Sequence, residues 1–234
     1  MREWISGSTT ERTEPDRADP SPRSSTRPVE RRLNKKRRLL LLKGLVWLLG
    51  LAPLAWLIWR GLTDRLGANP IEQVQHRLGD IALITLLVTL SITPIRRLTG
   101  WNSLAPLRRP IGLFAFFYLT VHLIWYAVID ETLDFEFIIE DVVERPYILV
   151  GFTAWLLLIP LAITSTRGWI RRLKKNWRRL HRLVYVSTGL GVLHFYWQVK
   201  ADTYWPIVAA TVLAVLLLLR IRRRRRPIQG SVAD

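Results

Sequence analysis

Four histidines are the side chains best suited to cofactor chemistry in this chain, and all of them lie in or beside strongly apolar segments. They are His76, His122, His181 and His194. An ionisable group at membrane depth is energetically costly, so each position is a candidate functional site. The sequence has no cysteine, which excludes disulfides, thiolate catalysis, iron–sulfur clusters and cysteine-linked haem. Imidazole nitrogens therefore remain the candidate metal ligands.

Two of these histidines are expected at the same depth. His122 lies 12 residues into the apolar stretch that begins at Pro110, and His194 lies 11 residues into the stretch that begins near Leu183. At about 1.5 Å per residue, both lie about 17 Å from the basic end of their stretch. Two imidazoles at one level on different helices suit the two axial positions of a haem held in a helical bundle. We therefore predict a haem-ligand pair; hydrogen bonding to a neighbouring helix is the alternative role.

The other two histidines lie at the edges of the apolar stretches. His181 precedes His194 by 13 residues, about 20 Å along a helix axis, and would lie about 140° away around it. The two rings then need different neighbours, and His181 is a candidate ligand of a second haem. His76 begins its stretch at the outer edge and is a candidate haem-propionate or quinone contact. Simple hydrogen bonding is an equal alternative for both.

A membrane scaffold must position these residues. The chain has 234 residues, of which 50% are hydrophobic, with 11 tryptophans, and it carries a formal charge of +17. Its apolar residues gather in runs near 20 residues, long enough to cross a hydrocarbon core of about 30 Å. The sequence therefore predicts an all-α polytopic membrane bundle of six transmembrane helices, at residues 39–59, 76–95, 110–129, 147–166, 183–199 and 204–221.

The arginines and lysines indicate the orientation of these spans. Four basic segments, "RRLNKKRR", "RRLTGWNSLAPLRR", "RGWIRRLKKNWRR" and "RIRRRRR", alternate with the acidic "DETLDFEFIIEDVVER" between the third and fourth spans. The positive-inside rule then places both termini in the cytoplasm. Nucleic-acid binding is disfavoured, because the basic residues bracket apolar spans instead of forming one folded face with stacking aromatics.

The chain divides into three predicted parts. Residues 1–38 are rich in Ser, Thr, Pro and Arg and are expected to form a disordered cytoplasmic region. Residues 39–222 form the six-helix membrane domain, and residues 223–234 form a basic cytoplasmic tail. The first span is too long for a signal peptide and is read as a retained helix. No internal repeat is evident.

Several segments of the membrane domain carry a family resemblance. In order, they are "GLGANPIEQVQHRLGD", "ITPIRRL", "RRPIGLFAFFYLTVHLIWYAVID", "ERPYILVGFTAWLLLIPLAITST" and "WRRLHRLVYVSTGLGVLHFYWQVK". Over about residues 40–222, the chain resembles the haem-binding membrane subunits of periplasmic protein-methionine-sulfoxide reductase systems. It is also similar to the wider ferric reductase and NADPH oxidase membrane family, which has two histidines where the third span here has His122 alone. This difference leaves the second ligand of any inner haem open.

The resemblance implies an electron-transfer subunit in a bacterial inner membrane. It implies haem b, one or two per chain, with His122, His181 and His194 as haem-associated residues, and it allows FMN as a further cofactor. Electrons would come from a membrane quinone or a separate cytoplasmic flavin reductase. They would pass to a periplasmic molybdopterin-containing methionine sulfoxide reductase, which is the catalytic subunit. The acidic outer segment is a candidate docking surface for that partner, and a solvated loop is the alternative.

Two other classes of function remain open on the sequence. A ferric or cupric reductase would use the same haems and deliver electrons to a metal ion. A non-redox transporter or scaffold would need no haem, but transporters commonly show paired repeats and broken helices, which are not evident here.

Overall fold

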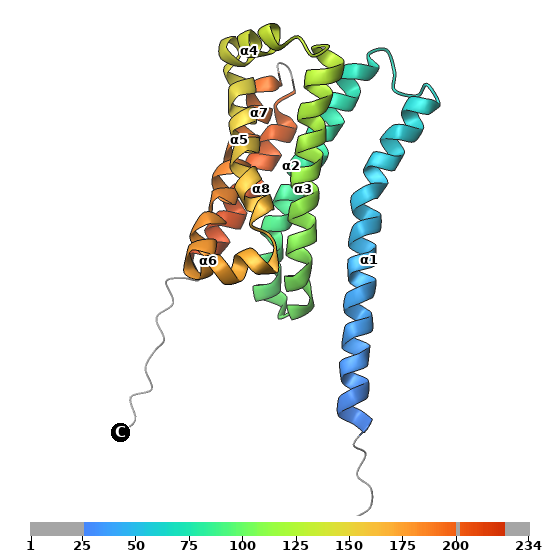
Figure 1. The fold of residues 1–234 in the computed structure, drawn as a ribbon, viewed down its shortest axis with the longest axis vertical. Coiled ribbons are helices and arrows are strands. Elements are labelled where there is room, and N and C mark those ends of the chain that lie inside the picture. The colour runs from blue at the N-terminus through green and yellow to red at the C-terminus, as the bar shows by residue number, and fades with distance from the viewer. Residues whose placement is uncertain (1–25, 200–201, 223–234) are drawn as a thin grey trace, which may run out of the picture. The chain divides into compact units, whose positions relative to one another are not determined.

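The fold of the described residues is entirely helical, which confirms the all-α prediction. The computed structural model describes residues 26–199 and 202–222 (Figure 1). The elements are α1 (Thr26–Leu62), α2 (Pro70–Thr99), η1 (Asn102–Leu107), α3 (Arg108–Trp125), η2 (Tyr126–Asp130), α4 (Phe135–Glu144), α5 (Pro146–Ile163), α6 (Arg167–Leu180), α7 (Leu183–Gln198) and α8 (Tyr204–Arg222).

The chain divides into two units, residues 1–38 and 39–234. Of the predicted N-terminal region, residues 1–25 lie outside the described residues, and α1 begins at Thr26. The predicted basic tail, residues 223–234, also lies outside them.

Five helical segments are long and apolar enough to cross a membrane. They are Lys36–Leu62, Pro70–Thr99, Asn102–Asp130, Pro146–Ile163 and Tyr204–Ile221. The predicted fifth span corresponds to α7, which has 16 residues and falls short of the 18 that the other segments reach. A multi-pass membrane protein is thus supported, and a sixth span through α7 stays a prediction.

Local sequence signals explain where the helices of the bundle begin and end. Pro70 and Pro146 stand at the first helical positions of α2 and α5, where the missing N–H has no helical partner to lose. The Asn69 side chain caps α2 by accepting a hydrogen bond from the backbone N–H of Glu72. Gly100 ends α2 with φ of 76°, a left-handed conformation that favours glycine.

Two antiparallel helix pairs form the core of the bundle. The helix α2 packs along α3, and α5 packs along α7, with α8 against α7. The shared core holds leucines of α2 and α5 together with small residues such as Ala115. Ser187 of α7 is fully buried and donates a hydrogen bond to the Ala154 carbonyl of α5. Small side chains at these positions let the helices approach closely.

The short helices α4 and α6 lie at opposite ends of the bundle (Figure 1). We refer to the two ends of the bundle as the α4 end and the α6 end. The α4 end carries the acidic segment 130–144, and the α6 end carries Arg96 and Arg97 at the end of α2 and the basic helix α6. The two ends therefore differ in the sign of their charge.

Substitution of Ala115 by leucine tests this packing. Ala115 is fully buried in the core, so Ala115→Leu should overpack it and lower the free energy of unfolding by about 1–3 kcal/mol. Ile124→Leu on the outer face of the same helix is the control, because the Ile124 side chain is exposed. Thermal unfolding in detergent, followed by circular dichroism, measures both. Equal unfolding temperatures for the two variants would contradict the packing described.

Candidate functional site

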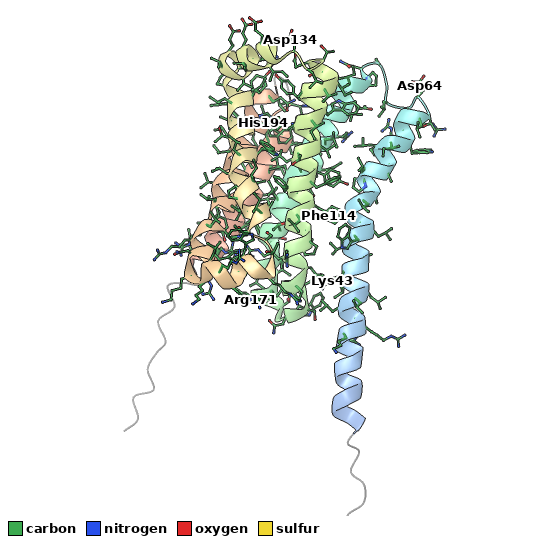
Figure 2. All side chains as sticks on the ribbon, viewed as in Figure 1. Lys43, Asp64, Phe114, Asp134, Arg171 and His194 are labelled. Atoms are coloured by element: carbon green, nitrogen blue, oxygen red, sulfur yellow. The ribbon has the colours of Figure 1, made fainter. Side chains whose placement is uncertain are left out.

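The rings of His122 and His194 meet inside the bundle. Their centroids are 6.4 Å apart, and their planes are nearly perpendicular, at 82°. His122 comes from α3 and His194 from α7, so each helix pair contributes one ring. Figure 2 shows His194 nearer to Asp134, at the α4 end, than to Arg171 at the α6 end. We call this pair the α4-end site.

Each imidazole is oriented by a backbone carbonyl of the other helix in its pair. The Nδ1 atom of His122 lies 2.9 Å from the carbonyl oxygen of Gln75, and that of His194 lies 2.6 Å from the carbonyl oxygen of Tyr147. A carbonyl only accepts, so each Nδ1 carries the proton and donates. The Nε2 atom of each neutral ring is then left as the metal-binding nitrogen, the arrangement common to metal-bound histidines.

Glycines make room for the two rings. Gly79 stands one helical turn after Gln75, and a Cβ there would lie 3.2 Å from the Cε1 atom of His122. Gly151 stands one turn after Tyr147, and a Cβ there would lie 2.7 Å from the Nδ1 atom of His194. Real Cβ atoms do not approach a ring this closely, so any other residue at Gly151 would displace the imidazole.

The two halves of the site are therefore built alike. In both, the carbonyl and the histidine that it orients are 47 residues apart, and the glycine follows the carbonyl by one turn. The sequence shows no internal repeat, because each half of this arrangement consists of only one glycine, one histidine and one backbone atom. So few residues leave no pattern in the sequence, and neither the glycines nor the carbonyls were predicted from it.

The geometry of the pair fits an iron ion between the rings. A metal–imidazole bond of about 2 Å, with about 1.1 Å from nitrogen to ring centre on each side, gives about 6.2 Å between the centres. The measured 6.4 Å agrees with this. Among the described residues there is no group of three or more histidine, cysteine or carboxylate side chains placed to hold a metal ion. The donor set thus suits a porphyrin iron, which needs only two axial ligands from the protein.

A cavity of about 340 Å³ lies toward the α6 end, and His181 lines it. His181 lies in the turn between α6 and α7, so the expectation that it shares a helix with His194 is wrong. The ring of Trp177 stacks on the His181 ring with 4.0 Å between their centroids. The Nε2 atom of His181 lies 3.1 Å from the Thr164 hydroxyl. We call this space the α6-end cavity.

The α6-end cavity combines an apolar wall with positive charge. Three arginines line it, Arg96 from α2 and Arg108 and Arg109 from α3. Burial, with a smaller effect from the positive charge of Arg108, lowers the pKa of the His181 imidazole from 6.5 to about 4. The ring is therefore neutral at pH 7 and able to coordinate a metal, while the guanidinium groups suit a carboxylate or phosphate.

His76 belongs neither to the α4-end site nor to the α6-end cavity. It lies in the second turn of α2, its side chain is 46% exposed, and its Nε2 is 4.0 Å from the Glu72 carboxylate. Among the ring contacts of the described residues, none involves His76.

Comparison with known proteins places this chain in a family. Residues 78–192 match the family model described as "Ferric reductase like transmembrane component". Curated proteins named "Protein-methionine-sulfoxide reductase heme-binding subunit MsrQ" are similar over most of the chain. The one from Xanthomonas euvesicatoria pv. vesicatoria is 50% identical over 188 residues, which are 78% of this chain and 86% of the relative. The chain belongs to the MsrQ family.

Further MsrQ relatives are similar to the chain to the same degree. The one from Xanthomonas oryzae pv. oryzae is 52% identical over 181 residues, covering 75% of this chain and 83% of the relative. The one from Herminiimonas arsenicoxydans is 49% identical over 187 residues, covering 79% and 86%. The region that matches the ferric reductase-like family includes Gly79, His122, Gly151 and His181 and ends two residues before His194. This confirms the family resemblance drawn from the sequence.

Substitution of Gly151 tests the α4-end site. In Gly151→Ala the added Cβ meets the His194 ring at 2.7 Å, so we expect haem affinity to fall about 10- to 100-fold. Gly189→Ala on α7 is the matched control, because a Cβ there meets no atom within 4 Å. Haem titration of both variants in detergent provides the measurement. Equal affinities would show that the glycine does not hold the ring in place.

Proposed function

We propose that the chain is a transmembrane b-type cytochrome in which His122 and His194 are the axial ligands of a haem b. The observation that carries this proposal is the separation of 6.4 Å between two rings whose Nδ1 atoms are both bound to carbonyls. The name of the MsrQ relatives, a heme-binding subunit, supports the same conclusion. The chain then acts as the electron-transfer subunit of a reductase system, and another subunit performs the catalysis.

The direction of electron transfer follows from the charge of the two ends. Basic residues near membrane spans remain on the cytoplasmic side, so the α6 end faces the cytoplasm of a bacterial inner membrane and the α4 end faces the periplasm. Six spans, with α7 as the fifth, place both termini in the cytoplasm. Electrons enter from the reduced form of a membrane quinone, the quinol, or from a cytoplasmic flavin reductase. They leave toward a periplasmic molybdopterin-containing reductase of methionine sulfoxide, which repairs oxidised proteins.

The α6-end cavity is proposed to hold a second cofactor, either a second haem b or FMN. His181 offers a neutral imidazole, and the three lining arginines offer partners for haem propionates or a flavin phosphate. Two cofactors toward opposite ends would divide the crossing of a hydrocarbon core of about 30 Å into shorter steps. His76 stays a candidate haem-propionate or quinone contact at the opposite edge of the bundle.

The residues of this chain would bind the haem, orient its histidine ligands and keep water away from it. Haem iron supplies reversible one-electron transfer. His122 and His194 present neutral nitrogens, and the carbonyls of Gln75 and Tyr147 hold the proton on each Nδ1 and increase the basicity of the ring. The apolar core between the helix pairs excludes water, which helps to set the reduction potential.

Transfer of electrons to a metal ion is the second candidate function. The match of residues 78–192 to a component described as ferric reductase-like favours it. Reduction of chelated iron by the chain alone, without any periplasmic partner, would identify this activity.

Histidine substitutions test the cofactor assignments. We expect His122→Ala and His194→Ala to lose the haem of the α4-end site, because each leaves the iron with one protein ligand. His181→Ala should remove only the signal of a second haem, if haem is the second cofactor. His76→Ala should keep the iron ligands of the pair and therefore the haem, since His76 is not one of the two rings that meet at the α4-end site. Absorption spectra of the oxidised and dithionite-reduced protein measure each. Full haem retention in both pair variants would refute the proposed function.

A test of electron delivery uses proteoliposomes that contain the chain. With the haem reduced by a quinol, addition of a molybdopterin methionine sulfoxide reductase and its substrate should reoxidise the haem. Stopped-flow absorbance follows the reaction, with free methionine sulfoxide and no reductase as the control. Reoxidation by chelated iron alone would favour the metal-reductase alternative.

A further inference from the structure

A buried carboxylate lies at the α4 end, outside the residues that meet at the α4-end site. The Asp141 side chain of α4 is 4% exposed although it belongs to the acidic segment of the chain. Its Oδ2 accepts a hydrogen bond of 2.6 Å from the phenol of Tyr126, and its Oδ1 forms an ion pair with Nε of Arg145 at 2.7 Å. Charge-assisted bonds of this length fix both partners in direction as well as distance.

One partner of Asp141 is continuous with the helix that carries His122. Tyr126 begins η2, a single π turn that continues α3, and its backbone N–H donates to the carbonyls of His122 and Leu123. Single π turns of this kind occur frequently at functional sites. A bond to the Tyr126 phenol therefore holds the end of α3 one turn beyond the His122 ring.

The other partner is continuous with the group that orients His194. Arg145 precedes the first residue of α5, and its carbonyl accepts the backbone N–H of Ile148. Tyr147, within this first turn of α5, supplies the carbonyl to the Nδ1 atom of His194. A bond to Arg145 therefore holds the turn from which the His194 ring is oriented.

Asp141 thus joins the two helix pairs at the end nearest the imidazoles. Among the described residues, a polar side-chain bond also links α3 and α5 directly, from Trp155 Nε1 to the Thr120 hydroxyl at 3.0 Å. The described core between the helix pairs is built of apolar side chains, whose packing is not directional. The distance between the two rings depends on how the two helix pairs pack against each other. A directional bond between the helix pairs therefore affects that distance.

We propose that Asp141 is a positioning residue for the α4-end site, setting the spacing and the angle between the His122 and His194 rings through Tyr126 and Arg145. This inference rests on the proposed function, because it assigns Asp141 a role in holding the haem ligands. Asp141 touches neither ring, and its effect passes through the ends of α3 and α5.

The test compares three variants of the full chain in detergent with bound haem. Asp141→Asn keeps the size of the side chain and an acceptor for Tyr126 but loses the charge that pairs with Arg145. Tyr126→Phe removes only the hydroxyl. Glu140→Gln is the matched control, since Glu140 is an exposed neighbour on the same helix and loses the same charge.

Two measurements separate positioning from general stability. Transfer of haem to apomyoglobin reports ligand strength, and we expect it to be about 10-fold faster in Asp141→Asn than in the unmodified chain. The electron paramagnetic resonance spectrum of the ferric haem reports the angle between the imidazole planes, and we expect it to shift in Asp141→Asn and, by less, in Tyr126→Phe. Both measurements should be unchanged in Glu140→Gln.

The outcomes distinguish this inference from the function on which it rests. If Asp141→Asn behaves as Glu140→Gln does, the positioning role is wrong while the haem assignment stands. If Asp141→Asn does not fold, Tyr126→Phe decides, and an unchanged spectrum and transfer rate in that variant would overturn the inference. An unmodified chain that binds no haem would overturn both.

Discussion

The separation of two imidazole rings is the constraint on which the rest of the structure depends. His122 and His194 come from different helix pairs, and one metal ion accepts both only when their free nitrogens are about 4 Å apart. Backbone carbonyls orient the rings, so the spacing is carried by the packing of the helices themselves. Glycines stand where each ring meets the neighbouring helix, because any larger residue would push the ring away from its partner. The site is therefore a property of the whole bundle.

The two ends of the bundle carry side chains of opposite charge. At the α6 end, three arginines line an apolar cavity beside a neutral His181. At the α4 end, the carboxylate of Asp141 is buried against Tyr126 and Arg145. The first arrangement suits an anionic cofactor, and the second ties the helices together. In a membrane with the basic end in the cytoplasm, the same asymmetry gives the proposed electron transfer its direction.

Sequence reasoning reached the imidazole pair because counting residues along two apolar stretches measures depth, and a helix converts residue number to distance at a fixed rate. It placed His181 on the helix of His194, which is wrong, because the count assumed one continuous helix and the chain turns between α6 and α7. It also missed Gly79, Gly151 and the two carbonyls. A glycine in an apolar helix has many uses, and a carbonyl has no sequence signal at all.

The sequence by itself determined the helical class, the apolar spans, the opposite charge of their ends and the family, because these follow from composition and local order along the chain. Only the tertiary structure decided that the rings of His122 and His194 lie 6.4 Å apart, that Arg108 and His181 line one cavity, and that Asp141 is buried. Each of these joins residues from different helices, and their meeting depends on the rotation and offset of packed helices, which composition and local periodicity do not specify.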